Sequence, residues 1–300
     1  MQKRMIKHLI TPVLGVYFLL FLHHYRERKI KPTHATTPPT WVSVHPSGRL
    51  GNQLFIAASS HGIAKRRKSK LCIHFKDWVD KEIFKSVVWL VRECPDGVVF
   101  ESLGENHKYA AHVSELESLY PTRSVMLNGY LQSHLYWRNY TIPFRLRHAN
   151  WARVWIRQRK IKVGIHARRG DYLSSPDHMG KTPPPEYYAT ALALSNTSAE
   201  NVLICSDSTD WVRRQPLFSG MHVSQGFSAG EDMALLSECE VLITSVGTFG
   251  WWAGYFKPRG TVFYYLKPDE DFQTGRVVPG DYFPANWVAI DDKSIRVSKH

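Results

Sequence analysis

The chain has 300 residues, of which 43% are hydrophobic and 13% aromatic, enough to build a large core and to exclude an overall disordered protein. The formal net charge of +13 favours anionic partners such as phosphate groups or acidic membrane surfaces. No stretch matches a DNA- or RNA-binding motif, and the basic residues are scattered apart from a short cluster at residues 65–70. We therefore expect no nucleic-acid partner.

The N-terminus predicts a membrane anchor. Basic residues precede an apolar stretch from Leu9 to Leu22, and no small-residue cleavage site follows it. With its flanks, this stretch is long enough to cross a thin bilayer, although the basic residues on both sides leave its orientation open. We expect a cytoplasmic tail at residues 1–8, a signal-anchor transmembrane helix at residues 9–25 and an extended Thr- and Pro-rich stem at residues 26–40.

Sequons and cysteines bear on the compartment. Asn139 and Asn196 each begin a glycosylation sequon, which is usable only if the C-terminal part is lumenal. The four cysteines are compatible with an oxidising lumen and permit three complete pairings among Cys72, Cys94, Cys205 and Cys239. Their spacing does not resemble a zinc site, so buried free thiols are the alternative to disulfides.

The folded region is predicted to start near Trp41. An apolar strand at residues 41–44 is followed by turn residues and by a helix that carries Leu54 and Phe55, which makes a β-loop-α unit. Residues 48–53 (GRLGNQ) connect the two, where backbone amides and the helix dipole favour an anion, a tight structural turn being the alternative. Another strand is expected at residues 70–75, and the topology up to residue 150 stays open.

Strands and helices alternate more clearly after residue 150. Buried strands are predicted at residues 161–166, 201–205, 241–245 and 261–265, and helices at residues 186–194 and 231–238. This alternation predicts a doubly wound α/β domain, whose ligand binds at the carboxyl ends of the strands. The loops after Ile165, Cys205 and Thr244 are therefore the expected ligand-binding loops.

Two polar segments follow buried strands of this domain. Residues 166–172 (HARRGDY) place Arg168 and Arg169 at the ligand-binding edge, where guanidinium groups suit a diphosphate and can neutralise a departing phosphate. Asp171 can hold one arginine or act as a base, and a surface ion-pair cluster is the alternative interpretation. Residues 245–252 (SVGTFGWW) begin a helix with small residues that expose amides and hydroxyls to phosphate, while at least one of its tryptophans is expected in the core.

In this order, the GRLGNQ, HARRGDY and SVGTFGWW segments resemble the signature regions of the α1,2-fucosyltransferases, glycosyltransferase family 11. The resemblance runs from Trp41 to Asp291. It implies a GT-B-like α/β fold with two Rossmann-like halves, an acceptor side at residues 41–150 and a GDP-fucose-binding half at residues 151–300. It also implies inverting, metal-independent transfer to a terminal β-galactoside, without a cofactor, by a type II Golgi membrane protein.

The resemblance also implies roles for individual residues. Arg168 is expected at the β-phosphate of GDP-fucose, and Asp232 corresponds to the aspartate with which more distant GDP-fucose enzymes recognise guanine. The other residues expected to bind the donor are Gly51, Asn52, His166, Arg169, Ser245, Thr248 and Phe249. Asp171 is the candidate general base by motif, with Asp177 and Glu186 as alternatives among which the sequence does not choose.

Two other functions stay open. A GDP-fucose enzyme that makes another linkage is one, because the arginine motif is shared more widely, although the GTFGWW segment favours the α1,2 family. A catalytically silent glycan-binding relative is the other, and the intact Arg168, Arg169, Asp171 and Thr248 argue against it. Residues 65–149 match no motif of the family, so the acceptor glycan beyond its terminal galactose stays open, as does the oligomeric state.

Overall fold

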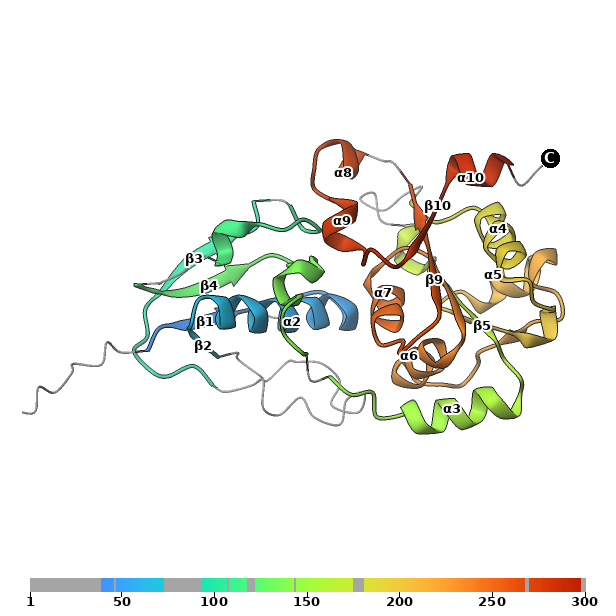
Figure 1. The fold of residues 1–300 in the computed structure, drawn as a ribbon, viewed down its shortest axis with the longest axis horizontal. Coiled ribbons are helices and arrows are strands. Elements are labelled where there is room, and N and C mark those ends of the chain that lie inside the picture. Colours follow the sequence, from blue (N-terminus) through green and yellow to red (C-terminus); the bar gives the residue numbers. More distant parts are fainter. Residues whose placement is uncertain are drawn as a thin grey trace, which may run out of the picture. The chain divides into compact units, whose positions relative to one another are not determined.

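The computed structural model describes residues 39–45, 47–72, 93–106, 108–117, 122–142, 144–174, 181–267 and 270–297. These residues do not include the predicted tail, the predicted membrane helix or most of the predicted stem. Asp177 also lies outside them. Among the described helices, none is long and apolar enough to cross a membrane. Thr40–His300 form one compact unit, which contains two parallel sheets (Figure 1).

The first sheet confirms the predicted β-loop-α unit. It is parallel, with the order β2-β1-β4-β3. Its strands are β1 (Trp41–Val44), β2 (Lys70–Leu71), β3 (Phe100–Gly104) and β4 (Ser124–Asn128), and short 3-10 turns occupy Ser114–Glu117 and His134–Trp137. Helix α2 (Leu50–Arg66) follows β1 and is buried along most of its length, because it packs on this sheet and also on the second half of the molecule.

The second sheet has the order β10-β9-β8-β5-β6-β7 and is also parallel. The strands are β5 (Val163–Ala167), β6 (Val202–Ser206), β7 (His222–Val223), β8 (Val241–Thr244), β9 (Thr261–Leu266) and β10 (Val288–Asp291). The chain winds outward from β5 in one direction and from β8 in the other, so the strand order reverses between them. Such a switch point is where doubly wound sheets bind ligands.

Helices cover both faces of this sheet (Figure 1). They are α3 (Ala149–Gln158), α4 (Pro185–Ser195), α5 (Thr209–Arg214), α6 (Ala229–Glu238), α7 (Thr248–Tyr255) and α10 (Asp292–Val297), with 3-10 turns at Gly170–Tyr172, Ala199–Asn201 and Pro216–Phe218. The short helices α8 (Glu270–Gln273) and α9 (Pro279–Tyr282) follow β9, and α9 contacts the His134–Trp137 turn of the first half. The predicted strands and both predicted helices of this half are confirmed to within a few residues. The two parallel α/β sheets are a GT-B-like arrangement.

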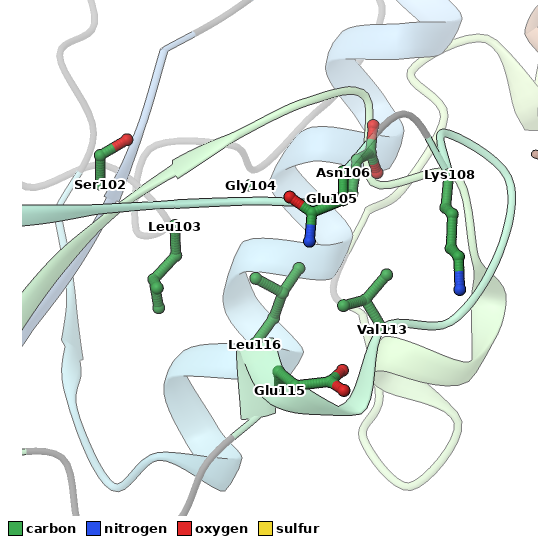
Figure 2. A pocket seen from close by; sticks show the side chains of 9 residues that line it. All are labelled: Ser102, Leu103, Gly104, Glu105, Asn106, Lys108, Val113, Glu115 and Leu116. Carbon is green, nitrogen blue, oxygen red and sulfur yellow. The ribbon is translucent and has the colours of Figure 1, made fainter.

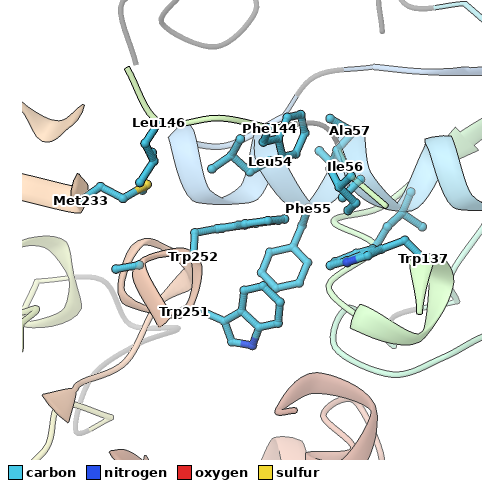
Figure 3. Packing of buried hydrophobic residues seen from close by; sticks show 14 of the residues in the cluster. Leu54, Phe55, Ile56, Ala57, Trp137, Phe144, Leu146, Met233, Trp251 and Trp252 are labelled. Atoms are coloured by element: carbon cyan, nitrogen blue, oxygen red, sulfur yellow. The ribbon is translucent and has the colours of Figure 1, made fainter. Parts of the chain in front are cut away.

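One aromatic cluster joins the two sheets (Figure 3). Phe55 of α2 lies with its ring centroid 4.4 Å from that of Trp251 and 5.2 Å from that of Trp252, both on α7. Trp137 stacks on Trp252 at 5.7 Å and donates its indole N–H to Tyr255. Both tryptophans of α7 are therefore core residues, and the hydrophobic core runs without a break from α2 to α7.

The end of the chain returns to the first half. Ala110 and Val277 form an isolated parallel bridge, and the backbone N–H of Val278 donates to the carbonyl of Ala110 at 3.0 Å. Asp281 accepts a hydrogen bond of 2.8 Å from the backbone N–H of His112. Residues beyond 270 therefore contact the half that precedes residue 150. The two halves of the structure are thus not separated at a single position in the sequence.

The cysteines form one disulfide among the described residues. Cys72 and Cys94 are bonded, with Cα atoms 4.9 Å apart, while Cys205 and Cys239 are buried free thiols. Of the arrangements that the sequence leaves open, the structure combines one disulfide with two thiols in the core.

Candidate functional site

Arg168 lies at the switch point of the second sheet. His166 of β5 is in register with Thr244 of β8, so the residues after both strands emerge side by side. The backbone N–H of Arg168 donates to Ser245 Oγ at 2.7 Å, which ties the two loops together. Its guanidinium donates through Nη1 to Asp207 and through Nη2 to Asp171. Two carboxylates thus fix the guanidinium plane, and the side chain keeps 19% of its surface exposed to a ligand.

Asp171 connects two of the three motif segments. One of its oxygens accepts from Arg168, and the other lies 3.4 Å from Nη2 of Arg49, the residue before α2. Both carboxylate oxygens therefore contact guanidinium groups, which suits holding the arginines in place. Of the alternative bases, Glu186 lies half-buried in the first turn of α4, and Asp177 lies outside the described residues.

Arg169 points elsewhere than Arg168. Its guanidinium carbon lies 4.1 Å from the ring centroid of Trp211 on α5, a cation–π contact, and its backbone N–H donates to Asp207 Oδ1 at 2.9 Å. Its Nε is buried without a hydrogen-bond partner. The two adjacent arginines that the sequence places at the ligand-binding edge therefore have different surroundings, with Arg168 between carboxylates and Arg169 against an indole.

His166 supports the site from below. It is buried, its ring centroid lies 5.3 Å from that of Phe249, and its Nδ1 is 3.5 Å from Ser245 Oγ. Burial lowers its pKa to about 4, so the imidazole is neutral at pH 7. A Cβ at Gly250 would lie 2.4 Å from His166 Nδ1, so only glycine lets α7 pack this closely on β5.

The N-termini of α2 and α7 meet beside these arginines. Thr248 Oγ1 donates to Asn52 Oδ1 at 2.8 Å, and the indole N–H of Trp252 donates to the carbonyl of Gly51 at 2.9 Å. Neither helix has a side-chain cap, and Gly247 before α7 has a φ of +87°. Two positive helix ends, with first-turn amides that no side chain caps, favour an anion at this point.

The charges of the site add to this field. Arg49 and Arg168 pair through their guanidinium groups with Asp171 and Asp207, while Arg169 contacts Asp207 only through its backbone N–H and adds its charge beside Trp211. Their formal charges of +3 and −2 leave +1, to which the two helix ends contribute. Among the residues that the structure describes, no group of three or more His, Cys, Asp or Glu side chains could hold a metal ion. Arginines and amides are thus the electropositive groups that the described site offers to an anion.

Asp232 lies farther along the same edge. It accepts hydrogen bonds from the Ser224 hydroxyl and from the Cys205 thiol, residues at the carboxyl ends of β7 and β6. Burial raises its pKa. Ser228 and Glu231 form a capping box that starts α6 and so fixes the turn on which Asp232 sits. The structure thus brings Asp232 to the edge that carries Arg168.

Both predicted glycosylation residues are exposed. Asn139 follows the 3-10 turn His134–Trp137, and Asn196 ends α4 with a φ of +43°. Their use remains a prediction.

Asp207 is a site residue that the sequence prediction missed. It binds both the guanidinium of Arg168 and the backbone N–H of Arg169, and a Cβ at Gly170 would lie 2.3 Å from its Oδ2. The signal in the sequence is weak: an acidic residue two positions after a predicted strand, in a loop that is expected to bind ligand. Arg49 is the other addition, since it stands within GRLGNQ without a predicted role.

The fold and site define a parallel α/β protein with an anion-binding switch point. Residues 130–291 match the model of glycosyl transferase family 11. The chain therefore belongs to glycosyltransferase family 11, which confirms the predicted family.

The chain is also similar in sequence to individual fucosyltransferases. Galactoside alpha-(1,2)-fucosyltransferase 2 of Oryctolagus cuniculus is 23% identical over 303 residues, which cover 87% of this chain and 79% of that protein. Galactoside alpha-(1,2)-fucosyltransferase 1 of Alouatta belzebul is 31% identical over 159 residues, which cover 49% of this chain and only 42% of that protein. Among solved structures, that of POFUT1 in complex with GDP has a TM-score of 0.49 at 13% identity and covers 76% of this chain and 99% of that one.

Proposed function

We propose that the protein transfers L-fucose from GDP-fucose, with inversion and in α1,2 linkage, to the terminal β-galactoside of a glycan. Family membership and the names of the relatives support this reaction. The observation that carries it is Arg168, fixed by Asp171 and Asp207 beside the uncapped start of α7. This arrangement suits the diphosphate of a nucleotide sugar.

The proposed role of Arg168 follows from the negative charge that develops on the leaving GDP. The acceptor hydroxyl oxygen forms a bond to C1 of fucose while the bond from C1 to the β-phosphate oxygen breaks, and GDP leaves with the bonding electron pair. The hydroxyl proton passes to a base. Negative charge grows on the β-phosphate, so a guanidinium that is already oriented binds the transition state more tightly than the ground state. Arg168 has this role in the proposal, with the amides of α7 beside it.

Metal independence belongs to the same proposal, because arginines and helix amides supply the positive field. We expect a chelator to leave most of the transfer rate intact. An enzyme that is dialysed against chelator and recovers only with manganese or magnesium would contradict this part.

We further propose that residues 9–25 anchor the protein in the Golgi membrane, with residues 1–8 cytosolic and the catalytic domain lumenal. The Cys72–Cys94 disulfide supports an oxidising compartment, and the exposed Asn139 and Asn196 support access to glycosylation. Protease added to intact vesicles should spare the domain, and the N139Q/N196Q double variant should lose the mass shift that glycosidase produces. Digestion of the domain in sealed vesicles would refute the topology.

Linkage analysis of products from a panel of β-galactosides and other glycans tests the function. We expect fucose on the 2-hydroxyl of galactose. Another linkage would favour the alternative GDP-fucose enzyme, and donor binding without turnover on any acceptor would favour the silent glycan-binding relative.

A further inference from the structure

A second concave site opens at the carboxyl ends of β3 and β4, in the first sheet. Its volume is about 520 Å³, within the range of ligand pockets. Its lining includes two tyrosines, two asparagines and one charge of each sign: Tyr109, Tyr130, Asn106, Asn128, Glu105 and Arg276. The neighbouring pocket of about 350 Å³ differs, because Leu103, Val113 and Leu116 converge in its interior and no aromatic side chain lines it (Figure 2).

The backbone conformation around Tyr130 is set by Glu105. The Glu105 carboxylate accepts hydrogen bonds from the backbone N–H groups of Tyr130 at 2.6 Å and of Leu131 at 2.8 Å. Gly129 has a φ of +125° and Leu131 a φ of +52°, so the segment takes a path that most residues avoid. A Cβ at Gly129 would lie 2.3 Å from Glu105 Oε1. This path leaves Tyr130 38% exposed at the pocket.

Hydrogen bonds connect the pocket with the donor site. The backbone N–H of Gln132 donates to the carbonyl of Tyr109 at 2.8 Å, and its side-chain amide donates to Asn52 Oδ1 at 3.0 Å. Asn52 is also bonded to Thr248 at the start of α7. One residue, Gln132, thus separates the pocket wall from the proposed phosphate site.

Both charged side chains that line the pocket have partners within the protein. The Glu105 carboxylate accepts from two backbone amides, and Arg276 lies 3.6 Å from Asp271, which also binds Lys181 at 2.5 Å and Tyr109 at 2.9 Å. Amide groups and an exposed aromatic ring suit a neutral ligand that has hydroxyls on its edge and an apolar face.

We propose that this pocket binds the terminal galactose ring of the acceptor, with Tyr130 as the surface on which the ring stacks. This inference rests on the proposed function. The axial 4-hydroxyl of a β-galactoside leaves one ring face lined by C–H groups, which packs on the phenol, while Asn106 and Asn128 meet the hydroxyls. The asymmetry of the pocket, with one aromatic wall and one amide wall, then orients the acceptor beside the donor.

The test uses the purified full chain with phenyl β-galactoside as acceptor and GDP-fucose as donor. Y130A should raise the KM for the galactoside about tenfold, as loss of one stacking surface predicts, with kcat and the affinity for GDP nearly unchanged. Y130F and Y130W keep the surface and should restore KM to within about threefold of the wild type. W151A is the matched control, because Trp151 is a similarly exposed aromatic that lies on α3, and it should change neither constant.

A binding measurement separates this inference from the proposed function. Saturation-transfer NMR with GDP and phenyl β-galactoside should show contact with the galactoside in the wild type and a clearly weaker signal in Y130A. If the wild type contacts the galactoside but transfers no fucose, the proposed reaction fails and the pocket stands. If the wild type shows no contact, or if folded Y130A keeps both the contact and the KM of the wild type, the pocket assignment is wrong.

Discussion

Gly51 and Trp252 are 201 positions apart in sequence, yet the carbonyl of Gly51 accepts a hydrogen bond of 2.9 Å from the indole N–H of Trp252. A Cβ at Gly51 would lie 2.4 Å from Thr248 Oγ1 and 2.8 Å from the backbone nitrogen of Phe249. The GRLGNQ segment, which follows a strand of the first sheet, thus contacts the SVGTFGWW segment, which follows a strand of the second sheet, through the backbone of Gly51. The absence of a side chain at Gly51 is what lets the starts of α2 and α7 approach each other this closely.

G51A should therefore damage both stability and donor binding. A methyl group here must displace the first turn of α7, and overpacking of this kind costs about 1–3 kcal/mol of folding free energy. We expect a lower melting temperature and weaker binding of GDP by calorimetry. G280A is the control, because a Cβ at Gly280 meets nothing within 4 Å. Equal melting temperatures and GDP affinities for wild type and G51A would contradict the close packing.

R168K should impair transfer while the fold survives. An ammonium group cannot bind Asp171, Asp207 and a phosphate in one plane, so transfer should fall about 30- to 1000-fold. The control is R153K, because Arg153 forms a bidentate pair with Glu238 at 3.0 and 2.9 Å on the surface of α3 and α6. R153K should keep the wild-type rate per folded molecule. Near-normal turnover of folded R168K would defeat the assignment.

D171N tests whether Asp171 acts as the general base or positions Arg168 and Arg49. Because both oxygens of Asp171 contact guanidinium groups, we expect kcat/KM for GDP-fucose to fall roughly 10- to 100-fold through misplacement of Arg168. The acidic limb of the pH–rate profile should remain. A loss of that limb, together with a much larger fall in kcat, would show that Asp171 is the general base.

Glu105 should make the stability of the wild type depend on pH. Burial raises the pKa of Glu105 from 4.5 to about 7, against the opposing effect of two backbone hydrogen bonds. Its contribution is fully present below pH 4.5 and is lost as the pH rises through 7. Relative to E105Q, which does not titrate here, the wild type should lose roughly 3 kcal/mol over this window. Chemical unfolding of both proteins from pH 4.5 to 8 measures the difference, and a constant difference would contradict the raised pKa.

Much of the second half of the molecule follows from the sequence. Its strands are short apolar runs separated by helices, so burial on both faces predicts them before any packing is known. The position of Arg168 also follows, because residues directly after a parallel strand emerge at the ligand edge. The first half is less predictable, since β2 and β3 are short or partly exposed and their pairing depends on β1 and β4.

The sequence by itself determined the doubly wound half and the three segments of the site, because each is a local pattern of apolar and polar residues, and the resemblance of those segments to known signature regions gave the family. Tertiary structure alone decided which side chains meet: Asp207 with Arg168, Arg49 with Asp171, Arg169 with Trp211, and Cys72 with Cys94. Most of these pairs join residues far apart in the chain. Such contacts depend on strand register and on the packing of α2 against α7, and no local pattern of residues encodes either.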